Sequence, residues 1–212
     1  MKGMKRKIRC GGKPVTVIVL AGGRGSRMGA DKAGLPPPGG TLPGRVLGQV
    51  GPLFDEVLVS VSPGQTIGAE DKRAGSVLSA GVRVVEDELP GQGPMAGVLA
   101  GLRAAKNDAC AIIACDIPDI DAPLLRELAR AAAEAEIAVP VTPKGDFEPL
   151  FAVYKKAVIP EIEKLLRAGE RSLIPLFGRC RTEYGPLKES GLLRNLNTRT
   201  DYEEYLKSLR SK

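Results

Sequence analysis

An uninterrupted, mostly β-branched run at residues 15–20 (VTVIVL) constrains the fold more than any other segment of the chain. Its apolar residues do not alternate with polar ones, which is typical of a strand buried on both faces in a parallel sheet. Pro14 precedes the run and Gly22-Gly23 follow it, and a glycine-rich loop continues to about Lys32. The segment therefore predicts an α/β protein whose first strand lies inside the sheet.

The remaining chain alternates between short apolar runs and helical patterns. Further strands are predicted at residues 57–61, 82–85, 111–114, 137–141 and 150–154, and helices at 46–53, 95–106, 122–135, 159–168 and 202–209. Residues 34–44, dense in Pro and Gly, are predicted to form a loop. This alternation predicts a single-domain, doubly wound, mostly parallel sheet flanked by helices, a Rossmann-like fold spanning residues 15–212. Residues 1–14 are predicted to be a basic, solvated N-terminal extension.

Composition excludes several kinds of chemistry. The chain of 212 residues has no histidine, which excludes Ser-His-Asp and Cys-His catalysis. The four cysteines form no C-x-x-C pair, which disfavours structural zinc. Catalysis would then depend on carboxylates, lysines, arginines, backbone amides or a metal ion.

Net charge and hydropathy limit the kinds of binding partner that we expect. The net charge of +6 favours an anionic substrate such as a polyphosphate. Aromatic residues make up only 4%, and no nucleic-acid-binding motif occurs, so no nucleic-acid partner is expected. There is no apolar run of the roughly 18 residues that a membrane span needs, and no secretory signal pattern, so we expect a cytoplasmic protein with no membrane partner.

The glycine-rich segment after the first strand reads LAGGRGSRMGADK, from Leu20 to Lys32. Glycines let backbone N–H groups approach an anion closely, and two arginines and a lysine add positive charge. A Walker A loop is absent because no Lys-Ser/Thr pair stands in the required place, and the G-x-G-x-x-G pattern is absent because Met28 occupies its last position. The composition suits a bound triphosphate.

This string resembles the L-A-G-G-x-S-x-R-M-G-x-D-K signature of the MobA-like nucleotidyltransferases. Later segments resemble that family's motifs in the same order: Val85-Glu86-Asp87, Gly93-Pro94-Met95-Ala96-Gly97-Val98, Cys115-Asp116-Ile117-Pro118, Glu148-Pro149-Leu150-Phe151-Ala152 and Asn195-Leu196-Asn197-Thr198. The resemblance spans nearly the whole chain. It implies Mg²⁺-dependent transfer of a nucleoside monophosphate from an NTP to a small phosphorylated acceptor, with release of pyrophosphate.

The resemblance also assigns roles to individual residues. It implies catalytic roles for Arg27, Lys32 and Asp116, and metal binding by Asp116 and Asn197. The residues implied to bind the nucleotide are Leu20, Ala21, Gly22, Gly23, Gly25, Lys32, Ser60, Asp87, Gly93 and Asp116. An acidic residue directly after a buried strand is well placed to hold Mg²⁺, which keeps most of its waters and bridges to phosphate oxygens. For Asp119 and Asp121 we favour helix capping or solvation.

The L-A-G-G sequence favours the guanylyl branch of the family, so the implied substrates are GTP and a molybdopterin-type acceptor. Contacts with other cofactor-biosynthesis proteins are a further expectation. Two features depart from the family pattern: residues 39–43 lack the usual lysine, and Ser60 stands where many members have Asn. A cytidylyltransferase, a transferase for another phosphorylated acceptor and a non-catalytic nucleotide-binding protein therefore remain as alternatives.

Overall fold

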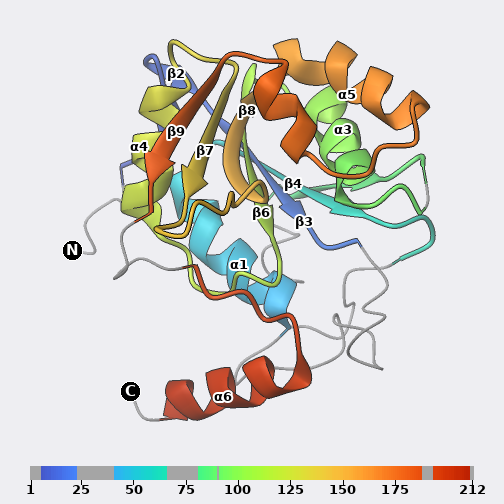
Figure 1. Cartoon of the computed structure of the whole chain (residues 1–212). Helices are drawn as coiled ribbons and strands as arrows, with labels where there is room; N and C mark the ends of the chain where they lie inside the picture. The colour runs from blue at the N-terminus through green and yellow to red at the C-terminus, as the bar shows by residue number, and fades with distance from the viewer. Residues whose placement is uncertain (1–5, 23–40, 66–80, 90, 188–192, 211–212) are drawn as a thin grey trace.

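The computed structural model describes residues 6–22, 41–65, 81–89, 91–187 and 193–210. Its centre is a seven-stranded sheet in the order β5-β4-β3-β6-β8-β7-β9 (Figure 1). The strands are β3 (Thr16–Leu20), β4 (Glu56–Val61), β5 (Arg83–Glu86), β6 (Ala109–Ala114), β7 (Ile137–Val141), β8 (Phe151–Lys155) and β9 (Thr182–Pro186).

The sheet is parallel except for β8, which runs antiparallel to both β6 and β7. From β3 the chain winds outward through β4 to β5, then returns to place β6 on the other side of β3. The strand order thus reverses between β3 and β6. In open α/β sheets, ligands bind beyond the carboxyl ends of the strands at such a reversal. The predicted doubly wound, mostly parallel sheet is confirmed.

Helices cover both faces of the sheet (Figure 1). α1 (Leu42–Val50) and α4 (Ala122–Ala131) pack on the face to which Val17 and Val19 contribute, and α3 (Pro94–Ala104) and α5 (Ile159–Arg167) pack on the face of Ile18 and Leu20. All five β3 side chains are buried, at 7% exposure or less. This explains why the first strand shows no apolar–polar alternation.

The last helix, α6 (Arg199–Arg210), lies beyond the carboxyl edge of the sheet (Figure 1). Its Tyr205 ring has the Arg45 and Arg194 guanidinium groups 5.6 Å from its centroid, and its hydroxyl donates to Asp119 Oδ1 at 3.1 Å. Thr198 and Asp201 exchange side-chain to backbone hydrogen bonds of 3.1 and 2.7 Å at the start of α6. This reciprocal cap begins the helix three residues before the predicted Tyr202.

The expected solvated extension is wrong for residues 8 and 10. Arg9–Cys10 (β1) and Lys13–Pro14 (β2) form an antiparallel hairpin. Ile8 is 1% exposed, and its N–H donates to Leu53 O at 2.8 Å. Burial of Ile8 and Cys10 against the α1 and α4 side of the core outweighs the basic character that suggested a solvated segment.

Two other element predictions need correction. α1 begins at Leu42, inside the predicted loop at 34–44, because Thr41 caps it by accepting from Gly44 N and Pro43 stands in its first turn. The helix ends at Val50 and a 3₁₀ turn (Gly51–Leu53) follows. β9 was not predicted, because Gly185 and Pro186 are unusual in strands; β9 is an edge strand, where Pro is tolerated.

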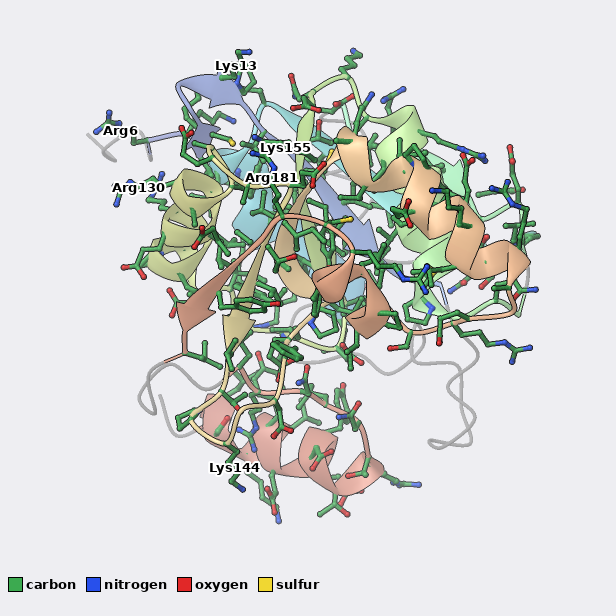
Figure 2. All side chains as sticks on the ribbon, turned by 45° about the horizontal axis from the view of Figure 1, so that its top comes forward. Arg6, Lys13, Arg130, Lys144, Lys155 and Arg181 are labelled. Carbon is green, nitrogen blue, oxygen red and sulfur yellow. The ribbon has the colours of Figure 1, made fainter. Side chains whose placement is uncertain are left out.

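The basic side chains labelled in Figure 2 lie at both ends of the sheet. Arg6, Lys13 and Arg130 lie near the N-terminal hairpin, whereas Lys144 lies toward α6 (Figure 2).

None of the helices described here is long and apolar enough to span a membrane. Burial raises the pKa of the Cys110 thiol to about 12, so this cysteine is a core residue and not a nucleophile at neutral pH.

Candidate active site

The first part of the site is the end of β3, where Leu20 leads into Ala21 and Gly22. The Ala21 and Gly22 N–H groups both donate to Ser60 O, at 2.9 and 3.1 Å. A Cβ atom on Gly22 would lie 2.9 Å from the backbone nitrogen of Ser62. Backbone atoms cannot move aside as a flexible side chain does, so only glycine fits where the chain leaves β3. A glycine is therefore required at the last described residue of this segment.

Ser60 and the start of α3 form the next part. The Ser60 side chain is 2% exposed, and a Cβ atom on Gly97 would lie 3.0 Å from its Oγ. Gly97 thus lets α3 pack directly against β4. Gly93 precedes the helix at φ 72°, a backbone conformation that favours glycine, and borders Arg171. The first N–H groups of α3 lack partners within the helix, and together with the helix dipole they favour an anion there.

Asp87 lies just beyond β5, next to the end of β4. Its N–H donates to Val61 O at 2.9 Å, and its Oδ1 accepts from Leu89 N at 2.8 Å. Burial, reinforced by the charge of Glu88, raises the pKa of the Asp87 carboxyl against the lowering effect of the Leu89 hydrogen bond. A half-buried acceptor in this place suits a ligand that donates hydrogen bonds, such as a nucleobase amide or amine.

Asp116 lies two residues beyond β6, at the strand-order reversal. The preceding residue, Cys115, donates its N–H to Leu20 O at 3.1 Å, which joins this turn to the end of β3. Leu196 N donates to Asp116 O at 2.9 Å and brings the C-terminal segment to the same point. The structure thus places the turn that carries Asp116 next to the end of β3, whereas the roles of both residues stay predictions. Asp121 caps α4 through Leu124 N at 2.9 Å, and Asp119 pairs with Arg45 at 2.8 Å.

Glu148 joins the site from the segment before β8, although no role was predicted for it. Its two carboxylate oxygens accept from Asn195 Nδ2 at 3.4 and 3.3 Å. Burial and then the nearby charge of Asp116 raise the pKa of this carboxyl, against the lowering effect of Asn195. The sequence held one signal for a role of Glu148, because an acidic residue stands there where the family motif that this segment resembles has Gln. Only the fold brings this carboxylate within reach of the charge of Asp116.

The donor set near Asp116 fits the implied Mg²⁺. Asp116 and Glu148 supply hard carboxylate oxygens, and the negative charge of Asp116 acts on the Glu148 carboxyl. Among the residues that the structure describes, no group of three or more metal-ligating side chains occurs. Mg²⁺ is commonly held by one or two protein carboxylates plus substrate phosphates, so two carboxylates are sufficient.

The structure does not locate every predicted site residue in the site. Asn197 is exposed, and its N–H donates to Asp201 Oδ2 at 3.0 Å, so its assignment as a metal ligand stays a prediction. Gly23, Gly25, Arg27 and Lys32 lie outside the described residues. Their roles therefore also stay predictions.

The sheet is doubly wound, and a backbone turn, a helix N-terminus and carboxylates lie at the ends of its strands. This architecture is typical of nucleotide-binding α/β proteins. Residues 17–182 match the sequence profile of the MobA-like NTP transferase domain. The chain belongs to this MobA-like nucleotidyltransferase family, which confirms the resemblance seen in the motifs.

Individual relatives agree with this assignment. A probable molybdenum cofactor guanylyltransferase of Carboxydothermus hydrogenoformans is 34% identical over 200 residues, covering 91% of this chain and 95% of the relative. A molybdenum cofactor guanylyltransferase of Pseudomonas putida is 38% identical over 162 residues, covering 76% and 80%. The crystal structure of molybdopterin-guanine dinucleotide biosynthesis protein A from Archaeoglobus fulgidus shares the fold, with a TM-score of 0.74 at 24% identity over 93% of this chain and 100% of the other.

Proposed function

We propose that this protein transfers GMP from GTP to a molybdopterin-type acceptor and releases pyrophosphate. The observation that carries the proposal is the similarity to a probable molybdenum cofactor guanylyltransferase over 91% of this chain and 95% of that relative. The arrangement of Leu20, Gly22, Asp87 and Asp116 around one sheet edge supports it, because a nucleotide needs a backbone cradle, a base contact and charge neutralisation near each other.

In the proposed reaction, an acceptor phosphate oxygen forms a bond to the α-phosphorus of GTP. The bond from that phosphorus to the bridging oxygen breaks, and the electron pair leaves with pyrophosphate. Such a displacement depends on in-line positioning and on neutralising charge more than on covalent catalysis. The Gly22 turn and the α3 N-terminus fix the nucleotide, and Arg27 and Lys32 neutralise the phosphates.

Asp116 and Asn197 are the proposed Mg²⁺ ligands, with Glu148 as the neighbouring carboxylate. Bound Mg²⁺ would supply charge stabilisation at the phosphate oxygens. A structure of a related fold, Rv0371C from Mycobacterium tuberculosis, has been solved in complex with manganese. A hard divalent cation on oxygen donors is consistent with the carboxylates of this site. We expect the enzyme to act in the cytoplasm, which cell fractionation tests.

The test is single-turnover pyrophosphate release with GTP, CTP or ATP, each with Mg²⁺ and molybdopterin. We expect release with GTP alone. A preference for CTP would replace the guanylyl assignment with the cytidylyl alternative. Absence of pyrophosphate with every nucleotide and acceptor tried would contradict transferase activity and leave the non-catalytic alternative. Omission of Mg²⁺, followed by addition of Mn²⁺ or Ca²⁺, tests the cation requirement in the same assay.

A further inference from the structure

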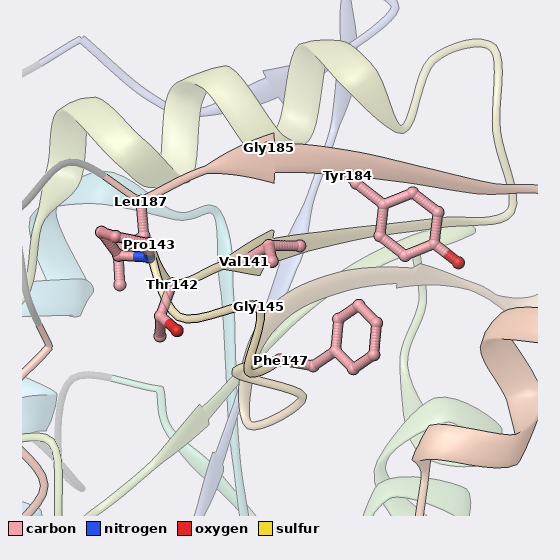
Figure 3. Close-up of a pocket in the computed structure, with 8 residues that line it drawn as sticks. All are labelled: Val141, Thr142, Pro143, Gly145, Phe147, Tyr184, Gly185 and Leu187. Carbon is pink, nitrogen blue, oxygen red and sulfur yellow. The ribbon is translucent and has the colours of Figure 1, made fainter.

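An apolar pocket of about 660 Å³ opens where β7 and β9 end, and neither the nucleotide site nor the metal site uses it (Figure 3). Its walls include Val141, Thr142, Phe147, Tyr184 and Leu187, and no side chain lining it carries a charge. This volume lies within the range of small-molecule sites, which are mostly apolar with a few polar groups. The pocket therefore suits an uncharged organic group rather than a phosphate.

Two aromatic rings form one end of this pocket. Phe147 and Tyr184 have ring centroids 5.6 Å apart at an interplanar angle of 38° (Figure 3). Phe147 also packs against Phe177 in an edge-to-face arrangement with centroids 5.2 Å apart, and Tyr184 donates its hydroxyl to Phe177 O at 3.4 Å. Tyr184 nevertheless remains 50% exposed. A fixed ring with exposed surface can stack against a flat conjugated ligand at little entropic cost.

Hydrogen bonds hold the turn after β7 and the end of β9 around the pocket. Thr142 N donates to Asp146 O at 2.8 Å, and Asp146 N donates to Thr142 Oγ1 at 3.1 Å, which closes the turn after β7. Leu187 N donates to Val141 O at 2.8 Å and ties the end of β9 to that of β7. The opposite end of the pocket is made by Thr142, Pro143 and Leu187 (Figure 3).

The pocket lies on the same edge of the sheet as Asp116. β7 and β9 run parallel to each other, and antiparallel β8 separates β7 from β6, so β6, β7 and β9 all end at that edge. With neighbouring strands about 4.8 Å apart, the ends of β6 and β7 are separated by about 10 Å. Phe147 is followed directly by Glu148, whose carboxyl is affected by the charge of Asp116. The nucleotide-side residues lie on the other half of the sheet, Ser60 in β4 and Asp87 just beyond β5.

We propose that this pocket binds the flat, fused heterocycle of the acceptor by stacking against Tyr184 and Phe147. The acceptor's phosphate then extends along the sheet edge toward Asp116. The proposal rests on the proposed function, because it assigns a place to the acceptor of that reaction. It explains why an uncharged aromatic pocket stands next to a site otherwise built for phosphates.

Tyr184→Ala and Tyr184→Leu test the proposal, since both remove the ring and Leu retains apolar volume at this half-exposed position. Removing a stacked aromatic ring typically weakens binding of a base about tenfold. We expect the KM for molybdopterin to rise about tenfold in both variants, with kcat at saturating acceptor and the dissociation constant for GTP unchanged. Tyr184→Phe keeps the ring and should stay within about twofold of the parent protein.

The matched control is Ile174→Ala, because Ile174 is also 50% exposed but does not line the pocket. Its KM should not change. Unchanged acceptor KM in Tyr184→Ala, or a loss of GTP affinity in its place, would overturn the proposal.

Binding of free pterin, followed by its own fluorescence, separates failure of the pocket from failure of the proposed function. We expect pterin to bind the parent protein and to bind Tyr184→Ala about tenfold more weakly. If this holds while no acceptor yields pyrophosphate, the pocket assignment stands and the transferase proposal fails. If pterin binds both proteins equally, or neither, the pocket assignment is wrong.

Discussion

Glu56, at the start of β4, accepts three hydrogen bonds that connect neighbouring parts of the sheet. Its Oε2 accepts from Thr16 Oγ1 at 2.7 Å and from Lys106 N at 2.8 Å, and its Oε1 accepts from Arg83 Nη2 at 2.7 Å. The Glu56 side chain is 10% exposed, and Thr16 is fully buried. Removal of this carboxylate therefore leaves a buried hydroxyl without its acceptor.

The expected destabilisation follows from those contacts. Glu56→Ala removes a charge-assisted acceptor and leaves the Thr16 O–H without an acceptor, although Thr16 Oγ1 still accepts from Asn107 Nδ2 at 3.1 Å. Lys106 N and the 46% exposed Arg83 gain water. We expect the free energy of unfolding to fall by about 2–4 kcal/mol. In Glu56→Gln one carbonyl oxygen still accepts from Thr16 and Lys106, and the loss of the Arg83 bond should lower that free energy by about 1 kcal/mol.

The contribution of the Glu56 carboxylate to the free energy of unfolding depends on pH, and the direction of this dependence follows from its pKa. Burial by itself raises the pKa of the Glu56 carboxyl, but the hydrogen bonds from Thr16, Lys106 and Arg83 outweigh burial and hold the pKa below its ordinary value of 4.5. A lowered folded-state pKa means that the contribution is complete above 4.5 and is lost as pH falls through the folded-state pKa. The difference between the parent protein and Glu56→Gln should therefore be constant from pH 7 to about 5 and shrink below it.

Urea denaturation followed by circular dichroism, repeated from pH 7 to pH 3, measures these differences. Glu163→Gln is the control, because Glu163 pairs with Arg103 at 2.9 Å on the surface and should change stability by about 0.5 kcal/mol or less. The reasoning fails if Glu56→Ala matches this control at pH 7, or if the Glu56→Gln difference grows as pH falls.

Three further substitutions test the site and its support. Asp116→Asn should abolish pyrophosphate release with unfolding unchanged within about 1 kcal/mol; near-normal turnover would remove Asp116 from the metal site. Gly22→Ala should weaken GTP binding in calorimetric titration and lower stability by about 1–3 kcal/mol, because its Cβ would lie 2.9 Å from Ser62 N; parent-like GTP affinity would show that the turn adapts. Gly101→Ala places a Cβ 2.6 Å from Ile18 Cγ2, so thermal unfolding should occur at lower temperature despite the better helix propensity of Ala, and a higher midpoint would contradict this packing.

Much of the nucleotide half of the site could be predicted from sequence. A buried strand followed by glycines marks where a parallel sheet opens, and the motifs after residues 85 and 114 mark neighbouring strand ends. In the structure, Leu20, Ser60 and Asp116 do meet at one edge, through the Ala21 N to Ser60 O and Cys115 N to Leu20 O hydrogen bonds. These relations were predictable because all three lie at or just beyond the carboxyl ends of parallel strands, which share an edge.

The acceptor half was less predictable. The Glu148 carboxylate and the Phe147–Tyr184 pair depend on β8 running antiparallel and on β9 pairing with β7. Tyr184 lies 37 residues after Phe147 in the numbering, in a strand whose Gly and Pro give no strand signal.

The sequence alone determined the α/β class, the buried first strand, the exclusion of histidine chemistry and the motifs of the family. These depend on local periodicity, residue type and spacing, which the chain carries in any conformation. Only the tertiary structure decided that Ile8 enters the core, that Glu148 comes within reach of the charge of Asp116 and that Tyr184 packs against Phe147. Such contacts join distant segments, and their free energy comes from burial and pairing that exist only once the sheet has assembled.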